Sequence, residues 1–131
     1  MSIVTVIDNL PKFAELTLQA WDRSLNRMAI DIERLSKAQV PVGPTKKQSR
    51  NSHSSGQLRS SGHHMKLGFL SYITYYNMEY ARYQEFGGDG KRTVRHYTKA
   101  GTGSFYLKNP GDLIASKALE YFMNETSKIV L

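Results

Sequence analysis

A long helical repeat near the N-terminus limits the possible folds more than any other part of the sequence. Large apolar residues and alanine recur there at alternating intervals of three and four, at Ala14, Leu18, Trp21, Leu25, Met28, Ile32 and Leu35. This spacing keeps one face of an α-helix apolar and predicts a helix over residues 11–39, about 29 residues and roughly 43 Å long. We expect that face to pack on a sheet or a second helix, with Trp21 buried. A helix this long overhangs a small domain, so contact with another subunit stays open.

The segments beside the repeat predict where the helix ends. Residues 3–7 are β-branched throughout and predict an edge strand before the helix. Pro11 suits the first helical turn. Pro41 ends the helix, because proline lacks an N–H donor and disfavours the helical conformation of the residue before it.

A polar segment follows the helix. Residues 45–55 contain no apolar side chain, so they cannot contribute to a core. We expect a flexible polar loop at about residues 43–56, within a single domain that spans residues 1–131. Its basic residues Lys46, Lys47 and Arg50 are candidate contacts for a partner.

Limited proteolysis tests the expected loop. Trypsin should cleave first after Lys46, Lys47 or Arg50, because a segment without core contacts opens at little cost in free energy. Resistance there, with earlier cleavage inside residues 11–39, would contradict the prediction.

The remaining sequence predicts a small sheet and a second helix. Residues 57–76 read as two strands that meet at a turn between Gly68 and Ser71. Residues 93–97 and 104–107 read as further strands, and residues 80–86 as a short helical turn. A final helix is expected over residues 113–127, with the apolar face Ile114, Ala118, Tyr121, Phe122 and Ile129. The predicted fold is α+β: a long N-terminal helix and a shorter C-terminal helix packed on a small, mostly antiparallel sheet.

Composition argues against several classes of function. The chain has no cysteine, which excludes disulfides, thiolate metal sites and cysteine nucleophiles. The histidines lack metal-ligand spacing, and no nucleophile elbow or phosphate loop is present. No apolar run approaches the roughly 20 residues that span a bilayer, and the N-terminus does not resemble a signal peptide. We therefore expect a protein that is not an enzyme, holds no cofactor or metal, and does not contact a membrane.

The charge distribution leaves a nucleic-acid-binding module as an alternative. The net charge is +7, and no acidic residue occurs from Arg34 to Met78. Five tyrosines, at 72, 75, 76, 80 and 83, lie near this basic stretch and are suited either to base stacking or to a protein interface. We favour the interface, because the motif of an RNA-recognition sheet is missing.

Three sequence blocks carry a resemblance to a known family. Residues 80–88, Tyr-Ala-Arg-Tyr-Gln-Glu-Phe-Gly-Gly, resemble the mid-chain signature of phage minor capsid, neck and tail-completion proteins of long-tailed bacteriophages. Residues 41–45 with 57–61, and residues 103–107 with Ala115 and Ala118, resemble the blocks before and after it, in the family order. The polar insertion at residues 46–55 departs from the family pattern, in which the first blocks are continuous.

The resemblance implies a structural virion protein at the head–tail junction, made in the bacterial cytoplasm. It would form a homo-oligomeric ring that joins or seals head and tail, next to connector or head-closure proteins and tail-tube or tail-terminator proteins, with non-specific contact to DNA in the channel. Candidate interaction residues, beyond the three basic loop residues, are Arg59, Tyr80, Tyr83, Glu85 and Phe86.

Glu85 is the acidic residue of the block that carries the aromatic residues Tyr80, Tyr83 and Phe86. If it is buried it needs a partner, for which Arg82 or a basic loop residue is available; otherwise it is an ordinary exposed carboxylate. The long apolar helix face and residues 80–86 are the two surfaces that we expect neighbouring subunits to share.

Overall fold

The computed structural model describes residues 3–40, 57–78, 81–86 and 103–130, without the side chains of residues 3–9 and 82–84. These ranges form α1 (Ile3–Gln39), α2 (Gln57–Ser60), β1 (Gly62–Gly68), β2 (Ser71–Tyr76), α3 (Ala81–Phe86), α4 (Lys108–Ser116) and α5 (Ala118–Thr126). The α+β prediction is confirmed, with a long N-terminal helix, shorter C-terminal helices and a two-stranded antiparallel sheet. The predicted loop at residues 43–56 and the predicted strand at residues 93–97 lie outside the described residues.

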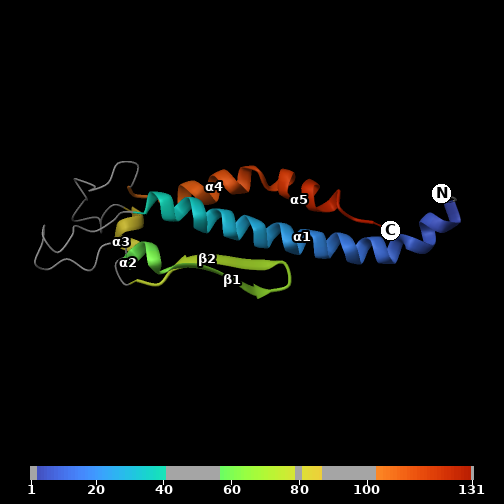
Figure 1. Cartoon of the computed structure of the whole chain (residues 1–131), viewed down its shortest axis with the longest axis horizontal. Coiled ribbons are helices and arrows are strands. Elements are labelled where there is room, and N and C mark those ends of the chain that lie inside the picture. The colour runs from blue at the N-terminus through green and yellow to red at the C-terminus, as the bar shows by residue number, and fades with distance from the viewer. Residues whose placement is uncertain (1–2, 41–56, 79–80, 87–102, 131) are drawn as a thin grey trace, which may run out of the picture.

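The elements form three layers with α1 in the middle (Figure 1). The β1–β2 hairpin lies along one side of α1, and α4 and α5 lie along the other. The N-terminal end of α1 extends beyond both outer layers (Figure 1). Helix α1 therefore has two contact faces instead of the single apolar face that the sequence predicts.

Helix α1 begins earlier than the sequence predicts. The strand expected at residues 3–7 is wrong: these residues are the first turns of α1, and Pro11 lies inside the helix. Strand propensity is worth only fractions of a kcal/mol per residue, and a strand also needs a neighbour for its backbone groups. A helix satisfies those groups internally, so a segment without a neighbouring strand extends the helix. The predicted end at Gln39 is confirmed.

The most buried positions of α1 are small residues. Ala20, Ser24, Ala29 and Ser36 are at most 5% exposed, whereas Trp21 is 41% exposed, so the predicted burial of Trp21 is wrong. Small side chains let the two outer layers approach the helix closely. The large stripe residues lie at the seam between the layers instead, where Leu25, Met28 and Ile32 line an open groove of about 420 Å³ beside the hairpin and α4.

A compact core lies at the C-terminal end of α1. Val40, Leu58 and Tyr106 are buried together, and Tyr76 packs against them. The rings of Tyr76 and Tyr106 meet edge to face with centroids 5.0 Å apart. Tyr106 donates its hydroxyl to the Ala81 carbonyl at 2.8 Å, which ties α3 to this core. Burial raises the pKa of Tyr76, so its hydroxyl stays neutral.

The hairpin confirms the predicted turn. Strands β1 and β2 pair antiparallel, with Gly68 opposite Ser71. Leu70 in the turn has a positive φ of 59°. Gly62 begins β1 where a Cβ atom would lie 2.7 Å from the Tyr76 ring, so this position requires glycine. The strand predicted from residue 57 begins later, because residues 57–60 form the short helix α2.

The C-terminal helix is divided in two and starts early. It begins at Lys108 and breaks at Lys117, which separates α4 from α5. The Ser116 hydroxyl donates to the Leu113 carbonyl at 2.6 Å, and the Lys117 N–H bonds the Ile114 carbonyl instead of continuing the α-helical pattern. Of the predicted apolar face, Ile114 is buried and the other four residues are half-buried.

Helix α5 is fixed to α1 by polar groups. The Tyr121 hydroxyl donates to Asp31 at 2.5 Å, and the buried Ser24 hydroxyl donates to the Tyr121 carbonyl at 3.2 Å. Burial, together with this hydrogen bond to Asp31, raises the pKa of Tyr121 to about 12. Because polar groups hold α5 on α1, not all of the apolar side chains of α5 are needed for this contact.

The strand predicted at residues 104–107 is wrong. Phe105 has a positive φ of 57°, and its N–H donates to the Glu85 carbonyl at 2.6 Å. The backbone here bonds to α3 and leads into α4, and it pairs with neither of the described strands, β1 and β2.

Candidate interaction surfaces

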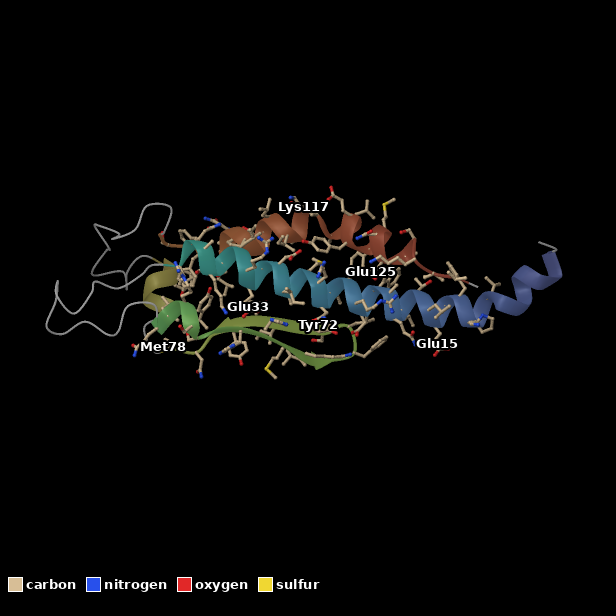
Figure 2. All side chains as sticks on the ribbon, in the orientation of Figure 1. Glu15, Glu33, Tyr72, Met78, Lys117 and Glu125 are labelled. Carbon is tan, nitrogen blue, oxygen red and sulfur yellow. The ribbon has the colours of Figure 1, made fainter. Side chains whose placement is uncertain are left out.

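The inward face of the hairpin is polar. Lys66 and Tyr72 both donate to the Asp22 carboxylate, at 2.9 and 3.0 Å. The Leu70 N–H donates to the same carboxylate at 2.9 Å, which holds the strained turn against α1. Figure 2 shows Glu33 and Tyr72 between α1 and the hairpin. The hairpin therefore docks on α1 through hydrogen bonds and ion pairs.

The same pattern continues along the strands. His64 contacts the Glu33 carboxylate, which also accepts from Lys37 at 2.9 Å. Thr74 donates to the Ala29 carbonyl at 3.0 Å, and the Tyr76 hydroxyl lies 2.7 Å from that of Ser36. Polar partners thus follow α1 from one end of the hairpin to the other.

Two carboxyl groups make this docking dependent on pH. The Leu70 N–H and then Lys66 lower the pKa of Asp22 below 3.8. Burial raises the pKa of Glu33, but hydrogen bonds from Lys37 and His64 outweigh it and leave that pKa below 4.5. Both groups thus stabilise the docked hairpin when they are ionised.

Acid should release the hairpin from α1. A lowered folded-state pKa gives stability that is present above the unfolded value and lost as the pH falls through the folded value. We expect amide exchange in β1 and β2 to accelerate below about pH 4 while the helical signal of α1 persists. An Asp22→Asn variant should show faster hairpin exchange already at neutral pH. Equal protection at pH 3 and pH 7 would contradict this account.

The outward face of the hairpin is apolar in the half nearest the turn, whereas the pair His63 and Tyr75 occupies the half nearest α2. Successive strand residues point to opposite faces, so the residues between the docking groups point away from α1. Met65 and Ile73 are cross-strand partners, whereas Leu67 lies at the register irregularity between Lys66 and Gly68 and has no partner opposite it. We define the outer hairpin face as the exposed apolar residues of the strands and the turn, Met65, Leu67, Phe69 and Ile73, which are 46, 60, 58 and 39% exposed. The Phe69 ring lies 6.0 Å from Nζ of Lys66. A hairpin in a monomeric domain normally buries its apolar face and exposes its polar one; here the polarity is reversed.

A second apolar surface lies on the opposite layer. Trp21 of α1 and residues of α5 form an open groove of about 650 Å³, which we call the α1–α5 groove. It is lined by Thr17, Trp21, Leu119, Phe122, Met123 and Thr126, with Ser127 at its end. Trp21 meets Phe122 edge to face at 5.9 Å, and Leu119 and Met123 are more than 60% exposed. The apolar helix stripe therefore contributes to a surface, as the sequence leaves open.

Glu85 binds backbone N–H groups, whereas the sequence suggests basic side chains as its partners. Its two carboxylate oxygens accept the N–H groups of Leu107 and Lys108, each at 2.9 Å. Those amides lie at the start of α4, where backbone donors lack intrahelical acceptors. Glu85 therefore caps α4 from α3, and the charge also suits the positive end of the helix.

Two of the other predicted contact residues have described side chains. Phe86 is 59% exposed and packs edge to face on Phe105 at 6.3 Å. In Arg59, Nε and Nη2 are buried and have no hydrogen-bond partner among the described residues. The backbone of Tyr83 lies in α3, but its side chain is outside the described part of the structure, as are Tyr80, Lys46, Lys47 and Arg50.

Several residues of the basic stretch are paired with acids of α1. Lys37 pairs with Glu33, and Lys66 with Asp22, both at 2.9 Å. Arg34 lies 3.9 Å from Asp31 on the same helix. These cations are thus partly compensated within the chain, although the linear sequence shows a run without acids.

The described ranges give no support for a metal centre or a membrane span. Among them, no group of three histidine, aspartate or glutamate side chains is placed to hold a metal ion. None of the helices in these ranges is both long and apolar enough to cross a bilayer. The chain matches no protein-family model, no curated protein and no solved structure.

The sequence alone does not single out the docking carboxylates Asp22 and Glu33. A usable signal is present in the hairpin, where polar residues at 64, 66, 72 and 74 alternate with apolar residues at 65, 67 and 73. The alternation shows two unlike faces, and the acids of α1 match the cations of the polar one.

Proposed function

We propose that this chain is a structural assembly protein of the head–tail junction of a long-tailed bacteriophage, in a neck or tail-completion position. Copies of it would form a ring that joins or seals head and tail, between a connector or head-closure protein and a tail-tube or tail-terminator protein. The three sequence blocks that resemble the family support this assignment. No catalytic step belongs to the proposal.

The reversed polarity of the hairpin is the observation that carries the proposal. A chain that acted alone would gain free energy by turning Met65, Leu67 and Ile73 toward α1. Instead, α1 presents Asp22 and Glu33 to polar strand residues, and the apolar face points outward. The largest exposed apolar patch of a soluble protein is often a functional surface. The structure thus fits a subunit whose burial is completed by assembly.

The location and the need for the protein are tested together in phage. Gold-labelled antibody should bind at the junction of head and tail in intact or partly disrupted particles. Phage that lack the gene should produce DNA-filled or leaking heads and separate tails, and supplying the gene on a plasmid should restore infectious particles. Normal particles without the protein would refute the proposal.

Nucleic-acid binding is the rival function, and the ion pairs weaken its basis. Binding through free cations gives an affinity that falls steeply with salt, roughly one logarithmic unit per phosphate contact for each tenfold rise in salt. With Lys37 and Lys66 paired to α1 acids, fewer cations of the described part of the chain are available. Tight duplex binding with a steep salt dependence, in a protein that does not self-associate, would favour the rival.

A further inference from the structure

The tip of the hairpin provides a projecting apolar group. Leu67 and Phe69 lie at the end of β1 and in the turn, and they are the two most exposed members of the outer hairpin face. The tip is held firmly, because the Leu70 N–H and Lys66 both bind Asp22. Large apolar side chains on a rigid support lose little conformational entropy when they bind, which is typical of interface anchors.

The α1–α5 groove provides a matching apolar recess. Its volume of about 650 Å³ is within the range of pockets that hold several side chains. Trp21, Leu119 and Met123 line it, and Thr17, Thr126 and Ser127 are its polar lining residues. An apolar centre with polar groups around it is the usual make-up of a protein–protein contact.

The sizes of the two surfaces agree. If a fully exposed large side chain has roughly 200 Å², the outer hairpin face exposes roughly 400 Å² of apolar residue surface, and Trp21, Leu119 and Met123 of the groove expose roughly 350 Å². Together they provide roughly 750 Å², about the apolar share of an interface near 1,300 Å² in total. Each surface alone is at the scale of the largest patch on a typical monomer.

The placement of the surfaces selects the partner and the kind of contact. The hairpin and α5 lie on opposite sides of α1 (Figure 1), so one copy cannot bring its own tip into its own groove. Pairing two hairpins symmetrically would cover both outer faces and leave both grooves open. Pairing the hairpin of one copy with the groove of the next covers both surfaces on every copy, and it repeats around a closed ring.

We propose that the outer hairpin face, with Leu67 and Phe69 as anchors, docks into the α1–α5 groove of a second copy of this chain. The proposal deepens the assembly function and rests on it for the choice of a like partner. In this arrangement the single tryptophan, Trp21, lies in the contact.

Cysteine cross-linking tests the contact directly, because the chain contains no cysteine. Leu67→Cys and Met123→Cys variants are prepared separately and treated with a short bis-maleimide, alone and after mixing. The mixture should give a cross-linked dimer that contains one copy of each variant, and each variant alone should give little. A Val130→Cys variant, whose residue is 83% exposed and belongs to neither surface, is the control partner and should not cross-link to Leu67→Cys.

Other products identify other contacts. A strong dimer from Leu67→Cys alone would show hairpin-to-hairpin pairing and overturn the proposal. Cross-linking of Leu67→Cys to a Phe13→Cys variant, in preference to Met123→Cys, would place the N-terminal part of α1 in that role and overturn it as well. An oligomer without the Leu67–Met123 product refutes this contact but leaves the assembly function standing, whereas normal phage lacking the protein refutes the function and leaves the cross-link result unaffected.

Discussion

Replacing Leu67 and Phe69 together by aspartate should prevent assembly without unfolding the chain. Two apolar anchors at roughly 2 kcal/mol each correspond to an association constant lower by about a thousandfold. Both residues are about 60% exposed at the tip of the hairpin, so the isolated fold loses little from their removal. The circular dichroism spectrum and the melting temperature should stay close to those of the wild type. In phage, the double variant should yield filled heads and separate tails, counted by electron microscopy and infectious titre.

A Val130→Asp variant is the matched control for this experiment. It introduces the same charge at another exposed apolar position, which belongs to neither the outer hairpin face nor the α1–α5 groove. It should assemble and infect normally. If the double variant and the control behave alike, the outer hairpin face is not an assembly surface.

Replacing Glu85 by alanine should produce the largest loss of stability among single changes in the aromatic block. The carboxylate accepts two backbone N–H groups at the start of α4, and both would lose a charged acceptor. Loss of a helix cap together with hydrogen bonds to a charged group costs about 2–3 kcal/mol. Guanidinium unfolding at neutral pH should show this decrease in the free energy of unfolding, with α4 the first helix to lose amide protection.

Two further variants separate capping from a general effect of charge. Glu85→Gln keeps one acceptor oxygen and should retain part of the stability. Glu120→Ala removes an exposed carboxylate of α5 and should change stability by less than about 0.5 kcal/mol. If Glu85→Ala and Glu120→Ala had the same small effect, Glu85 would not be a structural cap.

Local periodicity predicts well those elements whose backbone hydrogen bonds and turns are formed within the element itself. The end of α1 at Gln39, the hairpin turn near Gly68 and the helical turn ending at Phe86 follow from proline, glycine and spacing alone. The predictions fail where contacts with another element determine the backbone conformation. Residues 3–7 have strand propensity but no adjacent strand in the described part of the chain, and residues 104–107 bond to Glu85 of α3.

The surfaces were harder to predict than the elements. The apolar stripe of α1 predicts a face that packs on a sheet or a second helix, and leaves contact with another subunit open. Two layers contact α1, so small residues such as Ser24 and Ser36 are buried and Trp21 stays partly open. Which face of the hairpin points inward depends on Asp22 and Glu33, more than 30 residues earlier in the chain. Periodicity predicts that the hairpin has a polar face and an apolar face, but not which of them points toward α1.

Sedimentation velocity of the purified wild-type protein tests the central claim, that burial of the exposed apolar surfaces is completed by association of copies. The account predicts species heavier than the 14.9 kDa monomer, in a proportion that rises between about 1 μM and about 1 mM, the range in which a contact of this size should form. The emission of Trp21 should shift to shorter wavelength in step with the mass, because the groove that contains it becomes covered. A 14.9 kDa species throughout that range, with the emission of Trp21 unchanged, would contradict the account.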